Sequence, residues 1–172
     1  DYCLEFLNDP KSFTLKETQE WFKENDPEYY SIRVQNRDRM AGYIRTSKYD
    51  EKDRTMYIGL DLHPNFRGYG YAFQAYQKIM EILKVEKNLR RFYLEVQVNN
   101  FRAYNLYQKL GFNSIGIIPQ RVICPKRGFV DAILISSKYL FPTTVVIVWY
   151  ATNQTEFDEP CWNTSLLLET VI

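Results

Sequence analysis

The chain has 172 residues and carries 22 lysine or arginine residues against 21 aspartate or glutamate residues. This length is typical of one domain, and the near balance of charges, without a run of basic residues, argues against nucleic acid or an anionic membrane as the partner. The longest apolar run, Val145 to Ala151, is far shorter than the roughly 18 to 20 residues that a membrane-spanning helix needs.

The cysteines are odd in number and lie far apart in the sequence, at Cys3, Cys124 and Cys161. Such a pattern is typical of reduced thiols in a cytosolic protein rather than of a disulfide framework. With His63 as the only histidine, the chain also lacks the spacing of a zinc site. The N-terminus has no signal-like apolar segment, and we therefore expect a cytoplasmic protein without a metal centre.

The first predicted element is a helix from Thr14 to Asn25. Thr14 and Glu17 have the spacing of a capping box, and the sequence Asn25-Asp26-Pro27 favours a helix end. The apolar residues expected to anchor this helix are Leu15, Trp21 and Phe22.

Three strands are expected next. Residues 29–34 and 39–47 flank the polar turn 36–38 and predict a hairpin. A second polar turn, 50–53, leads into a strand at 55–62.

Residues 55–83 contain the clearest chemical signal of the chain. Every second residue is apolar at Met56, Ile58, Leu60 and Leu62, which predicts a strand with one buried face. A helical spacing then follows at Ala72, Phe73, Tyr76, Ile79, Met80 and Leu83. The loop between them contains Arg67 and two glycines. Because the first-turn amides of a helix lack partners and its dipole favours negative charge, this arrangement predicts a phosphate or pyrophosphate site.

Two common phosphate-binding motifs do not fit this loop. A dinucleotide fingerprint needs a third glycine where the chain has Phe73, and a Walker loop needs a lysine followed by serine or threonine. The ligand is therefore expected to be of another class.

A second strand and helix are predicted between Arg91 and Phe112. The strand alternates at Phe92, Leu94, Val96 and Val98, and the helix has apolar residues at Ala103, Leu106, Tyr107 and Leu110. Asn99 or Asn100 suits the N-cap, and Gly111 suits the left-handed residue after the helix. Two further strands, 113–119 and 128–140, are expected to form a closing hairpin. The element order implies a mixed sheet with helices on its faces.

Two motifs within these elements resemble a known family. The sequence R-x-x-G-x-A at residues 67–72 resembles the acyl-CoA pyrophosphate loop of the Gcn5-related N-acetyltransferase (GNAT) superfamily, and L-D-L-H-P-N-F before it resembles the strand and turn that lead into that loop. The sequence N-x-x-A-x-x-L-Y-x-K-x-G-F at residues 100–112 is similar to the family's other signature, and it lies at the family's usual distance downstream.

The resemblance covers about residues 1–140 and implies a GNAT domain there. The implied fold is α/β, of the α+β kind, with a mixed central sheet of about six to seven strands and helices on both faces. We expect the first strand of that fold to be absent or trimmed. Residues 141–172 form an extension without an assigned role, in which the run 143–150 could add an edge strand, mediate a homodimer or cover a gap in the core.

The resemblance also implies acetyl-CoA as co-substrate and a set of residues that bind it. The strands 55–62 and 91–98 are expected to splay apart and to expose backbone groups of Asp61 and Leu62 to the pantetheine arm and the acetyl carbonyl. Asn100 would contact the same arm, although a helix cap is its alternative role. The residues expected at the diphosphate are Arg67, Gly68, Tyr69, Gly70, Tyr71 and Ala72.

For catalysis, the resemblance implies that Tyr107 is the general acid that protonates the leaving thiolate. Its alternative role is that of a core residue, since it lies in an apolar stripe. The chain departs from the family at the usual glutamate base, where it has Tyr57. Glu95 and Asp61 are the candidate bases, and a relayed water or deprotonation in bulk solvent is the alternative. His63 is expected to be structural.

The resemblance leaves the acceptor open. We expect direct attack of a primary amine on the thioester, with a nucleotide-linked amino sugar slightly ahead of a polyamine or an aminoglycoside. One alternative is an N-terminal acetyltransferase of the ribosomal-protein type. Another is a non-catalytic acyl-CoA-binding regulatory module, which the tyrosine at position 57 would favour.

Overall fold

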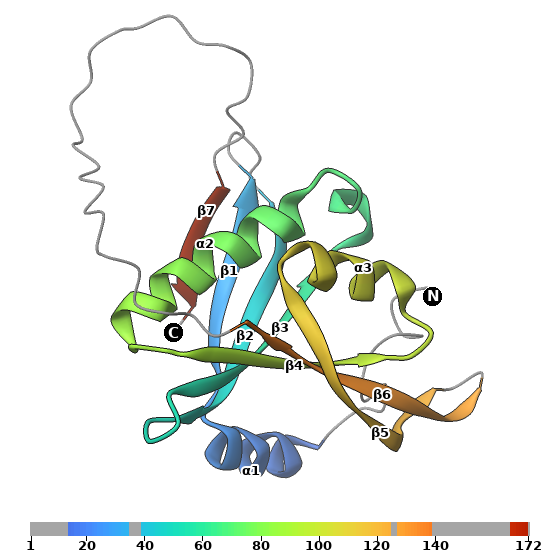
Figure 1. Cartoon of the computed structure of the whole chain (residues 1–172). Helices are drawn as coiled ribbons and strands as arrows, with labels where there is room; N and C mark the ends of the chain where they lie inside the picture. The colour runs from blue at the N-terminus through green and yellow to red at the C-terminus, as the bar shows by residue number, and fades with distance from the viewer. Residues whose placement is uncertain (1–13, 35–38, 125–126, 139–165, 172) are drawn as a thin grey trace, which may run out of the picture.

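A computed structural model describes residues 14–34, 39–124, 127–138 and 166–171 (Figure 1). Within them the elements follow one another as α1 (Leu15–Asn25), β1 (Glu28–Val34), β2 (Met40–Asp50), β3 (Thr55–Leu62), the short 3-10 helix η2 (Pro64–Phe66), α2 (Tyr71–Glu86), β4 (Arg91–Gln97), α3 (Phe101–Lys109), β5 (Phe112–Cys124), β6 (Gly128–Ser137) and β7 (Leu166–Val171). None of the helices in these ranges is both long and apolar enough to cross a bilayer.

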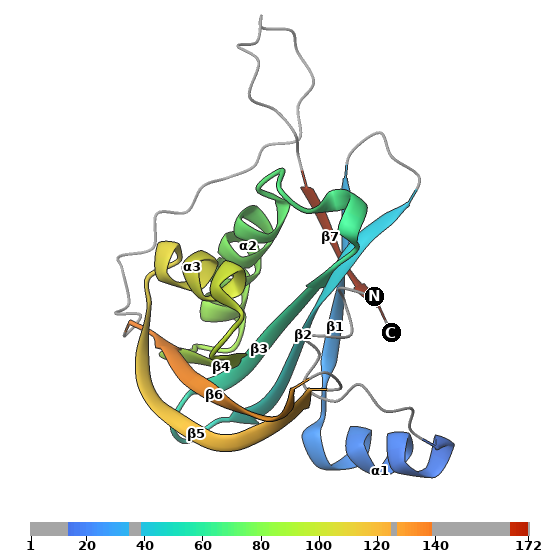
Figure 2. The ribbon, with the colours of Figure 1, turned by 90° about the vertical axis from the view of Figure 1, so that its right-hand side faces the viewer.

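The strands form one mixed sheet in the order β5-β6-β4-β3-β2-β1-β7. The pair β3 and β4 is parallel, and the other neighbouring strands are antiparallel. Helices α2 and α3 lie against one face, and α1 lies on the other side (Figure 2). The predicted mixed sheet with helices on both faces is therefore confirmed.

The main core lies between the sheet and α2 and α3. Alternate residues of the strands face these helices, because side chains of a strand point to its two faces in turn. The fully or nearly fully buried strand residues of this core include Ile44, Met56, Ile58, Phe92, Leu94, Val96 and Ile135. Helix α2 adds Tyr71, Ala75, Tyr76, Ile79 and Leu83. The predicted stripe is thus confirmed at Tyr76, Ile79 and Leu83, whereas Ala72, Phe73 and Met80 are only partly buried.

Helix α1 begins and ends as predicted but packs differently. The Thr14–Glu17 capping box is present, and Asp26 adopts the left-handed conformation at the C-cap. The expectation that Leu15 and Phe22 are buried anchors is wrong, because their exposed fractions are 75% and 44%. Two ring contacts join helix α1 to the sheet: the Trp21 ring lies 5.3 Å from the Arg45 guanidinium carbon, and the Phe22 ring is stacked on Tyr29.

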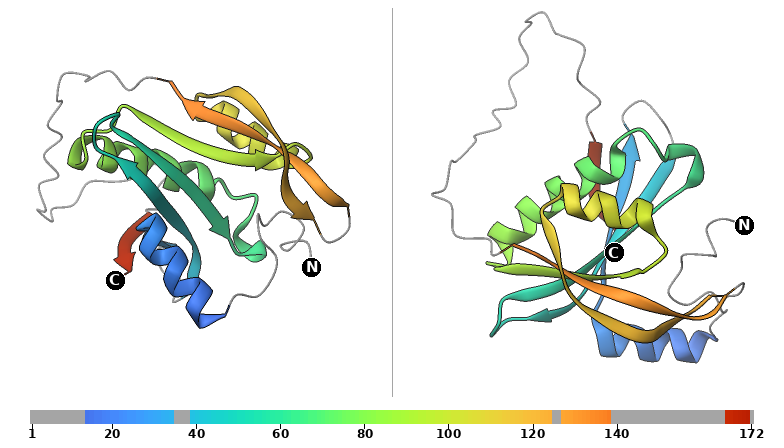
Figure 3. Two further views of the ribbon diagram at one scale, coloured as in Figure 1. Left: turned by 90° about the horizontal axis from the view of Figure 1, so that it is seen from below. Right: turned by 45° about the vertical axis from the view of Figure 1, so that its right-hand side comes forward.

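The closing hairpin and the last strand complete the sheet. Strands β5 and β6 pair from Phe112 and Ser137 to Cys124 and Gly128, as predicted. Strand β7 pairs with β1, so the segment that we set apart as an extension contributes one edge of the sheet (Figure 3). The predicted turn 36–38 and the run 143–150 lie outside the described residues.

One glycine fixes the distance between β2 and β3. A Cβ atom at Gly42 would overlap the carbonyl oxygen of Asp61 and lie 2.9 Å from the Cα atom of Leu62. The backbone of β2 therefore approaches the end of β3 more closely than any other residue type would allow.

We predict that Gly42→Ala lowers the free energy of unfolding by roughly 1–3 kcal/mol, the usual cost of overpacking. Gly116→Ala is the matched control, because Gly116 also lies in a strand and a Cβ atom added there would have no described neighbour within 4 Å. Urea denaturation of both variants measures the difference. Equal midpoints would show that the close approach at Gly42 is not required.

Candidate functional site

The parallel strands β3 and β4 pair over a short distance and then separate. Their paired residues are Thr55 with Arg91, Met56 with Phe92, and Tyr57 with Tyr93. Beyond these, β3 continues to pair with β2 and β4 continues to pair with β6. The two strands therefore diverge toward their carboxyl ends, as expected (Figure 3).

The alternation of backbone hydrogen bonds shows which groups face this gap. The amide of His63 donates to the carbonyl of Ala41 at 2.8 Å. In an antiparallel ladder the bonded and non-bonded pairs alternate, so the backbone groups of Asp61 point to β2. The expectation that the Asp61 backbone faces the gap is therefore wrong, because β2 occupies it. The backbone groups of Leu60 and Leu62 point to the opposite side, beyond the last residue pair with β4. The amides of Leu60 and Leu62 thus face the gap.

A glycine loop joins the end of β3 to the start of α2. Gly68 and Gly70 have φ angles of 90° and 81°, which only glycine adopts without strain. Gly70 is the N-cap of α2 and provides no side-chain cap, so no side chain of the cap satisfies the first-turn amides. Arg67 Nε donates to the carbonyl of Leu62 at 2.9 Å. This bond fixes the guanidinium against the end of β3, in the loop that leads to the helix N-terminus.

His63 has a structural role at the start of this loop. Its Nδ1 atom accepts a hydrogen bond from the amide of Asn65 at 3.3 Å. It thereby caps η2, whose only buried residue is Phe66. The structural assignment of His63 is confirmed.

Helix α3 begins on the other side of the gap with an asparagine cap. The Asn100 side chain accepts a hydrogen bond from the amide of Ala103 at 3.2 Å, and Gly111 after the helix has a φ angle of 84°. Both capping predictions are confirmed. The cap fixes Asn100 just beyond the carboxyl end of β4.

Tyr107 is buried between α3 and α2. Its hydroxyl lies 3.3 Å from that of Tyr76, and the two rings meet edge to face with centroids 5.7 Å apart. Burial is the main cause that raises the pKa of Tyr107, the hydrogen bond with Tyr76 acts in the opposite direction, and the charge of Asp61 raises it further. Burial, followed by the charge of Tyr107 and the hydrogen bond to it, raises the pKa of Tyr76 well above its ordinary value. Both hydroxyls are therefore protonated at neutral pH.

Asp61 lies at the exposed end of β3, opposite Tyr43 of β2. Burial, followed by the charge of Asp61 and a hydrogen bond to it, raises the pKa of Tyr43 to about 12. Asp61 and Tyr43 are therefore neighbours on the face of the sheet opposite α2 and α3. The sequence reasoning missed Tyr43, which could have been found only from the hairpin register.

Glu95 lies on the face of the sheet opposite α2 and α3, as expected. Its carboxylate accepts a hydrogen bond from Arg121 Nε at 2.7 Å, and the exposed fraction of its side chain is 12%. Burial, followed by the charge of Glu95, raises the pKa of Tyr57, so these two side chains lie near each other. Among the predicted residues, Tyr107 is thus bonded to Tyr76, Asp61 lies beside Tyr43, and Glu95 forms an ion pair with Arg121.

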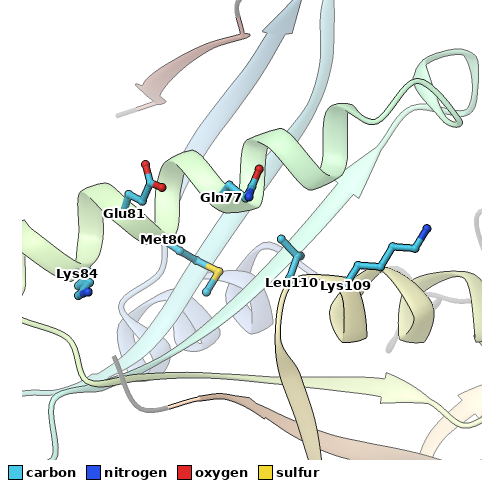
Figure 4. Close-up of a pocket in the computed structure, with 6 residues that line it drawn as sticks. All are labelled: Gln77, Met80, Glu81, Lys84, Lys109 and Leu110. Atoms are coloured by element: carbon cyan, nitrogen blue, oxygen red, sulfur yellow. The ribbon is translucent and has the colours of Figure 1, made fainter. Parts of the chain in front are cut away.

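A surface pocket of about 230 Å³ lies elsewhere, between the middle of α2 and the end of α3 (Figure 4). Its lining residues are Gln77, Met80, Glu81, Lys84, Lys109 and Leu110. None of the predicted site residues belongs to it, so the gap and not this pocket is the candidate site.

Known proteins match this chain in sequence. The model of the acetyltransferase (GNAT) family matches residues 2–112. The chain is 31% identical over 108 residues to YnaD, an uncharacterized N-acetyltransferase of Bacillus subtilis (strain 168), and the match covers 63% of this chain. It spans only 60% of the length of YnaD.

Solved structures share the fold. The spermidine N-acetyltransferase of Vibrio cholerae, in complex with CoA and spermine, superposes with a TM-score of 0.64 at 18% identity and covers 74% of this chain and 76% of its own. The ribosomal-protein alpha-N-acetyltransferase RimL, in complex with coenzyme A, gives a TM-score of 0.66 at 22% identity, with 79% and 80% covered. At these identities the likeness concerns the fold.

We predict that the buried tyrosine pair makes stability depend on pH in the alkaline range. The unfolded chain releases its tyrosine protons near pH 10, whereas the folded chain retains those of Tyr76 and Tyr107. The stabilisation is complete below about pH 10 and decreases as the pH rises above it, because the folded state then binds more protons than the unfolded state.

Tyr76→Phe should reduce this alkaline decrease and cost about 1 kcal/mol at pH 7, since the Tyr107 hydroxyl loses its partner. Tyr69→Phe, at a residue with an exposed fraction of 66%, should change neither quantity. Urea denaturation at pH 7 and pH 10.5 measures both. An identical pH response of the two variants would contradict the assignment.

Proposed function

The chain belongs to the acetyltransferase (GNAT) family, and we propose that it is an acetyl-CoA-dependent N-acetyltransferase that acts on a primary amine. The observation that supports this most strongly is the divergence of β3 and β4 beside a glycine loop that leads into the N-terminus of α2. A gap lined by backbone amides that point away from β2, next to an uncapped helix N-terminus, suits a ligand with an amide-bearing arm and a diphosphate.

The loop provides the groups for the diphosphate of acetyl-CoA. The amides of the first turn of α2 and the Arg67 guanidinium bind it, and Gly68 and Gly70 let the backbone approach it closely. The residues assigned to this role are Arg67, Gly68, Tyr69, Gly70, Tyr71 and Ala72. Leu62 and Asn100 then bind the pantetheine arm, which lies along β3 as an additional strand would.

The Leu62 amide and the Tyr107 hydroxyl provide two parts of the chemistry of acetyl transfer. The amide of Leu62 donates a hydrogen bond to the thioester oxygen, where negative charge develops. Tyr107 remains protonated because it is buried, and it donates its proton to the departing sulfur. Its hydrogen bond to Tyr76 fixes the direction of its hydroxyl group.

We assign the general base to Asp61 ahead of Glu95. Asp61 lies at the exposed end of β3, beyond the last residue pair with β4, whereas Glu95 is bonded to Arg121. Asp61 accepts a proton from the ammonium form of the acceptor, and the resulting neutral amine attacks the thioester carbon directly. The carbon–sulfur bond then breaks, and the departing thiolate takes the proton of Tyr107. Glu95 remains the second candidate, because it lies beside Tyr57, the position that holds a glutamate in many relatives.

For the acceptor we propose a small-molecule amine, with a nucleotide-linked amino sugar ahead of a polyamine or an aminoglycoside. The two solved structures named above are of enzymes that act on spermidine and on a ribosomal protein, so an N-terminal acetyltransferase is the second candidate. We further propose that the enzyme is cytoplasmic and acts without nucleic acid or a membrane. A homodimer through the run 143–150 stays a prediction.

Release of thiol from acetyl-CoA in the presence of a panel of amines tests the proposed function. We expect release with one class of amine, and we expect Tyr107→Phe to lower kcat by about 100-fold, the lower range for loss of a general acid. Tyr104→Phe is the matched control, since it removes from the same helix a hydroxyl that bonds at the surface, to Ser114. It should retain full turnover.

Two outcomes would contradict this proposal. Stabilisation by acetyl-CoA in a thermal melt, without thiol release on any amine, would favour the non-catalytic binding module. Equal turnover of Tyr107→Phe and Tyr104→Phe would remove Tyr107 from the mechanism.

A further inference from the structure

Gly59 lies in the middle of β3, although neither its conformation nor its packing requires a glycine. Its backbone is not in the left-handed region, unlike that of Gly68. No other backbone approaches it as that of Asp61 approaches Gly42. Among the described atoms, the nearest to a Cβ atom added at Gly59 is an Arg45 guanidinium nitrogen at 3.9 Å, which is an ordinary contact. A glycine inside a strand weakens the strand, and it often marks a place where another molecule approaches closely.

The missing side chain leaves room on the face of the sheet opposite α2 and α3. Every second side chain of a strand points to the same face, so a side chain at position 59 would stand between those of Tyr57 and Asp61. Gly59 is partly exposed, and solvent therefore reaches its backbone. We call this stretch of β3, from Tyr57 to Asp61 on that face, the Gly59 strip.

The Gly59 strip borders the gap between β3 and β4. The last residue pair of these strands is Tyr57 with Tyr93, so Gly59 lies beyond the part of β3 that β4 covers. A molecule that lies on the Gly59 strip is therefore beside the gap, where the proposed acetyl transfer takes place.

The groups around the Gly59 strip suit an organic molecule that carries an amine. At one end, the rings of Tyr57 and Tyr93 have centroids 5.7 Å apart and offer an apolar surface. At the other end is Asp61, the proposed base, two residues or about 7 Å beyond Gly59. Arg45 of β2 lies opposite Gly59 and closes the side away from the gap. The body of an acceptor can thus lie on the backbone while its amine reaches Asp61.

We propose that Gly59 determines which acceptors the enzyme takes, because the body of the acceptor lies directly on the β3 backbone at this residue. This inference rests on the proposed acetyl transfer and adds a specificity-determining residue to it. A side chain at position 59 would occupy the place of the acceptor. The glycine loop proposed to bind acetyl-CoA would stay unchanged, since it lies beyond the end of β3.

Gly59→Val tests this inference with the amine that has the highest kcat/KM in the thiol-release panel. We expect kcat/KM for that amine to fall by about tenfold or more, within the usual range for overpacking, and Gly59→Ala to give a smaller loss. The KM for acetyl-CoA should stay unchanged. The urea midpoint of Gly59→Val should equal or exceed that of the wild type, because valine suits a strand better than glycine. A merely structural role of Gly59 would instead lower stability and activity together.

Gly116→Val is the matched control for this substitution. Gly116 also lies inside a strand and has no described atom within 4 Å of an added Cβ atom. Its strand, β5, is separated from β3 by β6 and β4. The control variant should therefore retain the wild-type kcat/KM for the amine.

The outcomes separate this inference from the proposed function. Thiol release with equal kcat/KM for Gly59→Val and the wild type would overturn the inference and uphold acetyl transfer. A loss of the same size in Gly116→Val would also overturn the inference. If Gly59→Val does not fold, Gly59→Ala decides by the same comparison. Absence of thiol release with every amine would overturn both the inference and the proposed function.

Discussion

The site depends on the short pairing between β3 and β4, which share only three residue pairs. Parallel strands that separate leave backbone groups without partners, and such groups are costly to bury unless a ligand or water satisfies them. The separation is stabilised from both sides, because β2 packs closely against the end of β3 at Gly42 and β6 pairs with β4 from Tyr93 to Gln97. A ligand can therefore enter the gap without breaking a ladder of hydrogen bonds.

The two faces of the sheet have different chemistry because the side chains of a strand alternate. The even-numbered residues of β3 pack under α2 and α3, where burial keeps Tyr76 and Tyr107 protonated. The odd-numbered residues of β3 face the opposite side, where Tyr57 and Asp61 lie among charged neighbours. The gap between β3 and β4 lies between these two chemical environments.

Local patterns in the sequence were sufficient for most elements. The two-residue period of β3 and β4, the Thr14 and Asn100 caps and the glycines before α2 each depend on neighbouring residues, and the structure contains all of them. The alternation also predicted correctly that Glu95 faces away from Leu94 and Val96.

Contacts between distant segments could not be predicted in this way. The Arg121–Glu95 pair depends on a register shift in β5 between Ile118 and Val122, and the exposure of Leu15 depends on how little of the sheet α1 covers. Likewise, no periodicity near residue 166 could indicate that β7 pairs with β1.

Hydrogen–deuterium exchange with and without acetyl-CoA tests the central claim most directly, because it reports on individual backbone amides. The account predicts that saturating acetyl-CoA slows exchange at Leu60, Leu62 and residues 68–72, while exchange in the β1–β2 pair is unchanged. Unaltered exchange at the end of β3 and in the glycine loop would contradict the assignment of the gap as the acetyl-CoA site.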